Sequence, residues 1–312
     1  MNNIETDRII CGDCIEEMKK MPDQCVDLIF ADPPYWLRVD GVLHRVNGNQ
    51  YDGCDDEWDK FSSIEDYKKF TKEWLSQCKR ILKKNGSIWV IGGMQCIYTI
   101  GAMMQELGFW FINDVIWFKK NPTPNFMGTR LNNSHETLIW AIKDQKDSYT
   151  FNYKTAKELN TDTVSEKAYA HGIRKQLGSV WKIPLCQGVE RIKDKDGQKL
   201  HSTQKPETLL YRIIAINSKI NDIVFDPFGG TMTTAVMAKK MGRRYLSIER
   251  DETYCEYGQK RLDNTNISVG NIEKAIYDTK PPRVTFEEMI SNGYFTVGEK
   301  MYYQKVYSIE KI

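Results

Sequence analysis

A carboxylate, two prolines and an aromatic ring occupy consecutive positions early in the chain, as Asp32, Pro33, Pro34 and Tyr35. They follow an apolar run at residues 26–31, which predicts a buried strand that ends in a stiff loop. Two successive prolines remove two backbone donors and restrict the backbone. The loop therefore suits a flat ligand with an exocyclic amino group, whose N–H groups would bond to Asp32 and the Pro33 carbonyl while Tyr35 stacks on its ring. A plain strand-ending turn is the competing interpretation of these four residues alone.

A second motif, near the other end of the chain, has the pattern of a cofactor-binding turn. A strand is predicted at residues 222–225 and a helix at residues 235–241. The loop between them begins with Asp226, Pro227, Phe228, Gly229, Gly230 and Thr231. In doubly wound α/β folds, a strand, a glycine turn and a helix N-terminus bind a cofactor, and free N–H groups there favour an anionic group such as a carboxylate. Glu249 ends the next predicted strand about 20 positions later, which fits an acceptor for ribose hydroxyls.

Two further pairs of residues are expected beside this cofactor. Asp13 and Cys14 follow a predicted strand at residues 9–10, where the Asp13 carboxylate would accept from an amino group; a helix N-cap is the equal alternative. Gln204 and Lys205 open a predicted helix at residues 206–217. Lys205 is expected to pair with a carboxylate of the cofactor, and the alternative is a solvated lysine in the first turn.

The composition permits a large enzyme and argues against a membrane-spanning or secreted protein. The chain has 312 residues, of which 41% are hydrophobic and 28% charged, enough for one large α/β domain and a smaller lobe. Its net charge of +2 means that any nucleic-acid surface must be local. No apolar stretch approaches a membrane span, and no signal-peptide pattern opens the chain. The eight scattered cysteines suit a reducing cytoplasm. Cys11 and Cys14 form a lone CxxC, so no metal is expected.

Strands that alternate with helices predict a doubly wound, mostly parallel sheet covered on both faces. The main domain is expected at residues 1–280. Its first half, residues 1–142, carries the Asp32 loop and includes a strand at residues 87–91 after a turn at Asn85-Gly86. An inserted region at residues 143–200 is predicted to lie outside the sheet. Residues 201–280 carry the glycine motif, and residues 281–312 form a short β-rich tail. If both motifs line one pocket, the halves follow each other in the order opposite to most dinucleotide-binding proteins.

Together, these residues resemble the permuted, β-class DNA methyltransferases that modify amino groups. The similarity is greatest to the cell-cycle-regulated and HinfI-type adenine methyltransferases and covers nearly all of residues 5–300. It is carried by the stretches CGDCIEEMKKMP, FADPPYWL, DDEWDKF, GFWFINDVIWFKKNPTPNFMGTRLNNSHETLIW and HSTQKPETLL. The resemblance implies a circularly permuted, Rossmann-like class I methyltransferase fold and S-adenosylmethionine as methyl donor. It also implies methylation of adenine N6 in double-stranded DNA, typically at GANTC, by a cytoplasmic, nucleoid-associated enzyme of bacterial or phage type.

Three features depart from the pattern of this family. Met232 replaces a usual glycine in the cofactor loop, and Trp36 stands where asparagine is common, next to the target-base pocket. The chain stops at residue 312, whereas its relatives usually continue into a longer DNA-contacting module. The tail at residues 281–312 is therefore expected to be a shortened version of that module.

DNA contacts are expected from residues next to the pocket and in two long polar loops. The target base must leave the duplex to react, and Trp36 would then offer a second stacking face beside Tyr35; a core role is the alternative. Arginine favours guanine edges and asparagine favours adenine edges, whereas lysine more often meets phosphate. His135 and Glu136 are expected to be structural. The loop residues predicted to contact DNA are Arg38, Arg45, Lys119, Lys120, Asn125, Arg130, Asn132 and Asn133.

Several other functions compete with adenine methylation. A cytosine-N4 methyltransferase uses the same chemistry, although those enzymes more often carry serine in place of Asp32. An RNA or protein amino-methyltransferase and a catalytically silent DNA-binding module also stay open. Cytosine-C5 transfer needs a cysteine nucleophile in a Pro-Cys pair, and none of the ten prolines precedes cysteine. A dehydrogenase has no use for the residue 32–35 motif. The sequence leaves open a homodimer and a cognate restriction endonuclease.

Overall fold

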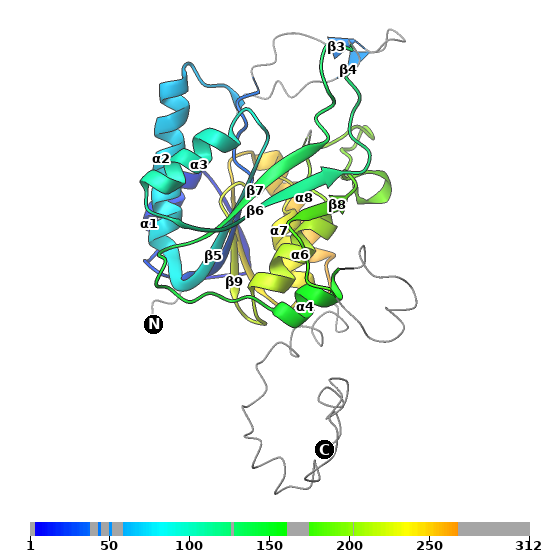
Figure 1. Ribbon diagram of the computed structural model, residues 1–312. Helices are drawn as coiled ribbons and strands as arrows, with labels where there is room; N and C mark the ends of the chain where they lie inside the picture. The colour runs from blue at the N-terminus through cyan, green and yellow to red at the C-terminus, as the bar shows by residue number, and fades with distance from the viewer. Residues whose placement is uncertain are drawn as a thin grey trace, which may run out of the picture. The chain divides into compact units, whose positions relative to one another are not determined.

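The computed structural model describes residues 4–37, 43–44, 50–51, 59–125, 128–160, 175–201 and 203–267. Within these ranges, no helix is long and apolar enough to cross a membrane. The predicted tail at residues 281–312 lies outside the described residues. A central sheet and the helices that cover it build the domain (Figure 1).

Over the described residues, one eight-stranded sheet forms the centre of the domain, in the order β1-β10-β9-β2-β5-β7-β6-β8. A separate two-stranded sheet pairs β3 with β4. The strand bounds are β1 (Arg8–Cys11), β2 (Val26–Ala31), β3 (Leu43–His44), β4 (Gln50–Tyr51), β5 (Leu82–Gly92), β6 (Trp110–Lys119), β7 (His135–Ile142), β8 (Val180–Ile183), β9 (Ile223–Asp226) and β10 (Arg244–Glu249).

The strand order reverses between β2 and β9. These neighbours are parallel, as are all the pairs from β1 to β5 in the sheet order, and only β7 runs the opposite way. From β2 the chain continues to β5 on one side, whereas from β9 it continues to β10 on the other. Ligands of doubly wound sheets bind outside the carboxyl ends of strands at such a reversal. The doubly wound, mostly parallel fold is confirmed, with the Asp32 half preceding the glycine-loop half.

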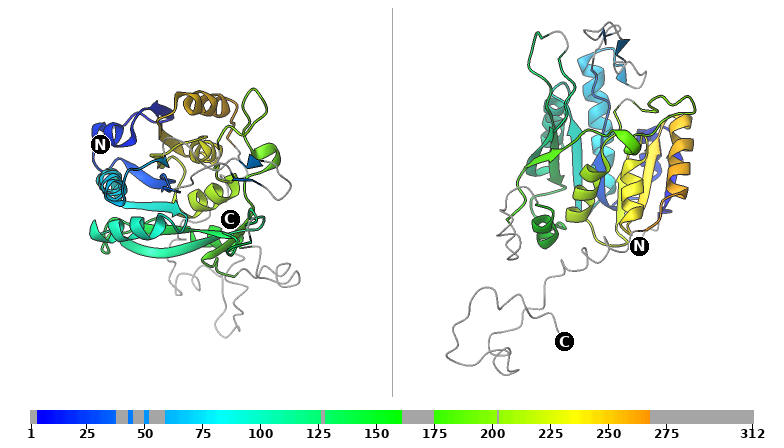
Figure 2. Two further views of the ribbon diagram at one scale, coloured as in Figure 1. Left: turned by 90° about the horizontal axis from the view of Figure 1, so that it is seen from above. Right: turned by 90° about the vertical axis from the view of Figure 1, so that its right-hand side faces the viewer.

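Two layers of helices cover the sheet, as Figures 1 and 2 show from three directions. One layer contains α1 (Cys14–Lys20), α2 (Ile64–Ile81) and α3 (Ile97–Glu106). The other contains α4 (Tyr153–Glu158), α6 (Glu207–Asn217), α7 (Thr233–Lys240) and α8 (Glu252–Asp263), with a 3-10 turn η2 (Gly188–Glu190) before α6.

Side-chain alternation along β2 separates the two hydrophobic cores. Ile29 and Ala31 belong to the core under α1–α3, whereas Leu28 and Phe30 belong to the core on the other face. Successive residues of a strand point to opposite faces, so a strand buried on both sides reads as one continuous apolar run. This explains why residues 26–31 look uniformly hydrophobic in the sequence.

The prediction that residues 143–200 lie outside the sheet is wrong for β8. This strand pairs in parallel with β6 at the sheet edge. Its residues alternate between exposed and buried, with Trp181 and Ile183 facing inward, but four residues are too few for alternation to be recognised in sequence. The same region is also tied to α6, because the Asn152 amide donates to the Ala215 and Ser218 carbonyls at 2.6 and 2.9 Å.

The predicted turn at Asn85-Gly86 is also wrong, because β5 runs through it from Leu82. The pairing with β2 shifts register between Val26 and Leu28, so the strand accommodates an irregularity at this place. A Cβ atom on Gly86 would lie 2.7 Å from the Asp27 carbonyl oxygen. The glycine therefore marks a close backbone approach within a strand.

Trp89 on β5 offers a test of the second core. Its buried indole stacks on Trp140 of β7, with ring centroids 5.3 Å apart, and donates to the Asn217 side chain on α6 at 2.9 Å. We expect Trp89→Ala to lower the free energy of unfolding by about 3–5 kcal/mol, because it leaves a cavity. Urea denaturation measures this. The control Trp110→Ala removes an indole that is 44% exposed. A loss of stability for Trp89→Ala that is no larger than the loss for Trp110→Ala would contradict the assignment of Trp89 to the core.

Candidate active site

A pocket lies where β2 and β9 end, at the reversal of the strand order. Residues of both sequence motifs line it together, although one motif lies near each end of the chain. Its wall contains all the residues predicted to be catalytic or to bind the cofactor: Asp13, Cys14, Asp32, Pro33, Pro34, Tyr35, Gln204, Lys205, Asp226, Pro227, Phe228, Gly229, Gly230, Thr231 and Glu249.

The loop after β2 is fixed from behind by two side chains. The Tyr67 hydroxyl, on α2, donates to the Pro34 carbonyl at 2.9 Å. The Asp59 carboxylate accepts from the backbone N–H groups of Trp36 and Leu37 at 2.6 and 2.7 Å. These bonds hold the two prolines between Asp32 and Tyr35 in one conformation.

Asp32 forms a buried ion pair with Lys205. The Lys205 Nζ atom donates to Asp32 Oδ2 at 2.6 Å, and the side chains are 7% and 17% exposed. Burial raises the pKa of Asp32, and the Lys205 charge opposes that rise. Burial favours a lower pKa for Lys205, but the charges of Asp32 and Glu136 raise it. Each charge therefore favours the ionised form of the other group. Lys205 was expected to hold a cofactor carboxylate; in the structure it faces Asp32 instead, because the start of α6 lies opposite the end of β2.

The other carboxylate oxygen of Asp32 has no partner. Among the described side-chain atoms that are buried, Asp32 Oδ1 is one of a few without a hydrogen-bond partner. Native proteins rarely leave a buried polar atom unpaired, and an unpaired one needs an explanation. This acceptor belongs to a residue of the pocket wall, so it is available to a ligand that brings an N–H group.

Glu136 does not line the pocket, but it contacts the pocket residue Tyr35. The sequence predicts a structural residue here, and its contacts are with protein side chains: its Oε2 atom accepts from the Tyr35 hydroxyl at 2.9 Å and its Oε1 atom lies 2.7 Å from Lys119 Nζ. Burial favours a higher pKa for Glu136, but the nearby Lys205 and Lys119 charges lower it, so the group is ionised. In the sequence, its position two residues after the long polar loop is the feature that could have indicated a contact near the pocket.

The glycine loop uses much of its hydrogen bonding internally. Asp226 accepts from the Phe228 N–H at 2.9 Å and from the Thr234 hydroxyl at 2.5 Å. Glu249 accepts from the Gly230 N–H at 2.6 Å. The N–H of Gly229 bonds to the Ile248 carbonyl at 2.8 Å. The expectation that free N–H groups bind an anion is therefore wrong for Phe228, Gly229 and Gly230, because carboxylates and carbonyls of the protein already satisfy them.

The cofactor loop carries Met232 at a position where the family usually has glycine. Its φ of 60° lies in the left-handed region, which normally favours glycine. Its side chain is fully buried and fills the space over two glycines: a Cβ on Gly229 or Gly258 would lie 2.7 or 2.3 Å from Met232 side-chain atoms. The buried methionine thus packs against both glycines, and a side chain at position 258 would force Met232 to move, because it would meet the Met232 Cγ atom close to the backbone.

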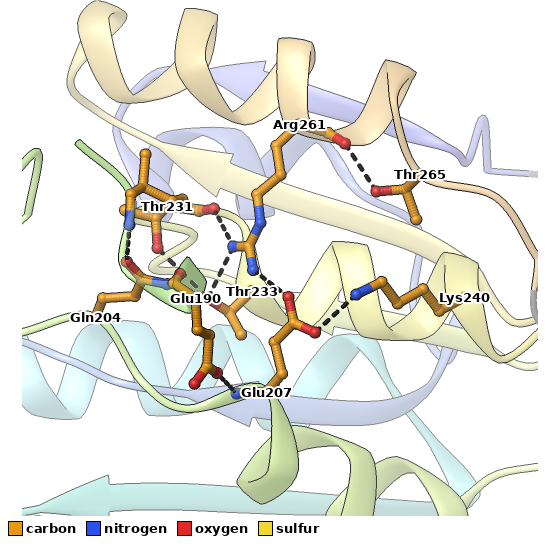
Figure 3. Close-up of polar contacts among 9 residues, drawn as sticks. Glu190, Gln204, Glu207, Thr231, Thr233, Lys240, Arg261 and Thr265 are labelled. Atoms are coloured by element: carbon orange, nitrogen blue, oxygen red, sulfur yellow. Dashed lines mark hydrogen bonds and ion pairs between the residues drawn. The ribbon is translucent and has the colours of Figure 1, made fainter. Parts of the chain in front are cut away.

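Arg261 of α8 clamps the cofactor loop from outside the pocket (Figure 3). Its guanidinium donates to the Thr231 carbonyl at 2.9 Å and to the Thr233 hydroxyl at 3.1 Å. It also pairs with Glu207 of α6 at 2.6 Å, and Glu207 in turn binds Lys240 of α7 at 2.7 Å. Three helices therefore meet at one carboxylate and fix the loop that follows β9.

Two predicted cofactor residues have structural partners. The Asp13 carboxylate accepts from the Ile15 and Glu16 N–H groups at 3.0 and 3.1 Å, so it caps α1, as the alternative interpretation expected. The Gln204 side chain accepts from the Ile192 N–H at 2.9 Å and donates to the Glu190 carbonyl at 2.8 Å. Both residues line the pocket, although these polar atoms bind neighbouring backbone groups.

The third predicted cofactor residue of this group, Cys14, is not ionised in the pocket wall. Burial raises the pKa of the Cys14 thiol to about 12, so the thiol stays neutral.

Trp36 contributes to the core rather than to the pocket wall. It is 9% exposed, and its ring stacks on Tyr67 with centroids 5.7 Å apart. Its positive φ of 51° turns the chain inward after Tyr35. The predicted stacking on a target base is therefore not supported, and the alternative of a core role is.

The predicted DNA-contacting loops are described only in part. Arg38 and Arg45 lie outside the described residues. In the second loop, the Asn125 N–H donates to the Asn132 side chain at 2.7 Å, and the Asn125 amide donates to the Arg130 carbonyl at 2.9 Å. These two amides shape the loop, whereas Arg130 and Asn133 are exposed.

His201 is a further pocket residue that sequence reasoning did not select. Its ring packs against Tyr254, with centroids 4.8 Å apart, and both line the pocket. Its place in the HSTQKP stretch, three positions before Gln204, was the available signal. In the described part of the chain, no group of three or more His, Cys, Asp or Glu side chains could hold a metal ion.

Comparison with known proteins agrees with this geometry. Residues 26–260 match the N6/N4 methyltransferase family, described as DNA methylase. The chain is 50% identical over 294 residues to the type II methyltransferase M.HinfI of Haemophilus influenzae, covering 94% of this chain and 79% of that protein. It is 37% identical over 260 residues to the type II methyltransferase M2.DpnII of Streptococcus pneumoniae, covering 83% and 90%. The crystal structure of the M1.HpyAVI–SAM complex aligns with a TM-score of 0.57 at 25% identity, covering 82% of this chain and 98% of that one. This chain therefore belongs to the N6/N4 family of DNA methylases.

Proposed function

We propose that this DNA methylase transfers a methyl group from S-adenosylmethionine to adenine N6 in double-stranded DNA, within GANTC sites. The observation that carries the proposal is the buried, unpartnered Oδ1 atom of Asp32, beside Tyr35 in the pocket. An amino group of a base would satisfy this acceptor. The 50% identity to M.HinfI supports adenine and the GANTC site, which the sequence resemblance also implies.

The residue 32–35 loop activates the amino nitrogen by accepting its hydrogens. The lone pair of that nitrogen is delocalised into the ring, which makes it a poor nucleophile. Hydrogen bonds to Asp32 and the Pro33 carbonyl draw the nitrogen toward a tetrahedral geometry and strengthen as it becomes positive. Burial raises the pKa of Asp32 and the Lys205 charge opposes that rise, which favours the ionised acceptor form. The carboxylate need not be a strong base, because the nitrogen can lose its proton after the methyl group has been transferred.

The acidic character of the pocket fits the proposed cofactor. S-adenosylmethionine supplies a methyl group activated by a positively charged sulfur. Burial raises the pKa of Asp226 to about 7, and the nearby charges of Asp32 and Glu249 add smaller contributions in the same direction. A cationic ligand near these carboxylates would favour their ionised forms. Phe228 and Gly230 would lie beside its methionine end, and Glu249 beside its ribose.

The DNA substrate must present an extruded base to this pocket. Flipping costs a few kcal/mol, and stacking on Tyr35 offsets part of it. Arg130 and Asn133, exposed in the loop between β6 and β7, would contact the duplex. The type II name of the M.HinfI relative supports a cognate restriction endonuclease as functional partner. A homodimer stays a prediction.

Base-resolved methylation of a random-sequence duplex pool tests the function. We expect N6-methyladenine within GANTC from the wild type. In Asp32→Asn, Lys205 would take the amide oxygen and leave the amide NH2 group facing the substrate amino group, so turnover should fall by roughly 10²–10³-fold or more. Calorimetry should show S-adenosylmethionine affinity nearly unchanged. N4-methylcytosine as product would assign the enzyme to cytosine, and normal turnover of Asp32→Asn would reject the mechanism.

The pH dependence tests the role of Lys205. Asp32 must be ionised to accept two hydrogen bonds, and burial raises its pKa while Lys205 opposes the rise. In Lys205→Met the opposing charge is lost, so the pKa of Asp32 increases and the acidic limb of kcat/KM should move to higher pH. The exposed Lys182→Met serves as control. An acidic limb that stays in place in Lys205→Met would remove the ion pair from the mechanism.

A further inference from the structure

A chain of polar contacts leads from the pocket to the base of the β6–β7 loop. The Tyr35 hydroxyl donates to Glu136, and Glu136 pairs with Lys119 at 2.9 and 2.7 Å, respectively. The carboxylate and ammonium side chains are only 12% and 13% exposed. Lys205 adds a cation 5.1 Å from the centre of the Tyr35 ring. Tyr35 is therefore held at its hydroxyl and faced by a charge on its ring.

The two ends of the β6–β7 loop supply Lys119 and Glu136, the ion pair that we call the brace of Tyr35. Lys119 is the last residue of β6 and Glu136 the second of β7, and Trp117 pairs with Glu136 in the antiparallel register. The Lys119 N–H also bonds to the Ser134 carbonyl at 2.8 Å, which closes the base of the loop. Because β7 runs against its neighbours, its first residues lie at the carboxyl edge of the sheet, beside Tyr35.

The energetics favour a positioning role over a purely structural one. A buried ion pair contributes little net stability, since desolvation offsets its attraction. The Glu136 carboxylate is ionised, and a hydrogen bond to an ionised acceptor is about twice as strong as a neutral one. What this arrangement provides is a fixed direction for the Tyr35 ring, and small misplacements of a reacting group can reduce rates about 10²-fold.

We propose that Glu136, anchored by Lys119, is a positioning residue for methyl transfer that holds the Tyr35 ring in the orientation needed by the extruded base. The inference rests on the proposed function and extends it to residues outside the two sequence motifs. Glu136 acts through Tyr35 and need not touch the base, the cofactor or the reacting atoms.

The paired variant Lys119→Met/Glu136→Leu removes the brace without leaving an unpaired buried charge. Replacing both partners by apolar groups of similar size costs little stability. We expect kcat/KM for DNA to fall about tenfold or more, with KM for S-adenosylmethionine and the melting temperature close to wild type. Adding Tyr35→Phe to this variant should cause little further loss, because the hydroxyl has already lost its partner. Glu136→Gln, which keeps an acceptor oxygen, should retain more activity than the paired variant.

Four outcomes would overturn the inference: wild-type kcat/KM for DNA in the paired variant, a rise in KM for S-adenosylmethionine that equals the loss for DNA, losses that multiply with Tyr35→Phe, or no recovery in Glu136→Gln. Should the paired variant not fold, Tyr35→Phe decides alone, since wild-type activity there overturns the role of the hydroxyl bond. Glu106→Gln, a change in an exposed ion pair with Lys72, is the matched control. All ratios are measured on a duplex that the wild type methylates, so a cytosine product would overturn the proposed function and leave this comparison valid.

Discussion

The buried ion pair between Asp32 and Lys205 joins the two halves of the chain at the pocket. Asp32 follows β2 in the first half, and Lys205 precedes α6 in the second. Neither charge would be stable alone at this depth, because an isolated buried charge loses its hydration without compensation. The pair therefore requires β2 and α6 to be correctly placed, and the parallel contact between β2 and β9 provides that placement.

The same pair divides the work of the Asp32 carboxylate. One oxygen accepts from Lys205, whose charge favours the ionised form, and the other is left without a partner. A carboxylate with both oxygens satisfied would have nothing to offer an incoming N–H group, and a carboxylate without Lys205 would tend to protonate. One oxygen of Asp32 thus binds the charge that favours ionisation, while the other oxygen is available to a ligand.

The cofactor loop is fixed differently, mostly by contacts with side chains that lie behind it. Asp226 and Glu249 satisfy backbone N–H groups of the loop, and Arg261 binds it from α8. Met232 takes a left-handed conformation and packs over Gly229 and Gly258. A loop that is fixed in this way keeps its shape before any ligand arrives, which reduces the ordering cost of binding.

The sequence by itself determined the two motifs, the alternation of strands and helices, and the family. These depend on local patterns: apolar runs, glycine turns and the residue 32–35 loop all lie within short stretches of chain. Only the tertiary structure decided the partners of the charged side chains, because Lys205, Glu136 and Lys119 meet Asp32 and Tyr35 across large sequence separations. It also decided that β8 joins the sheet and that Trp36 faces the core, since a four-residue strand and a single aromatic residue have no local pattern that distinguishes burial from binding. Local propensity specifies elements, whereas the pairing of buried charges follows from which strand ends the topology brings together.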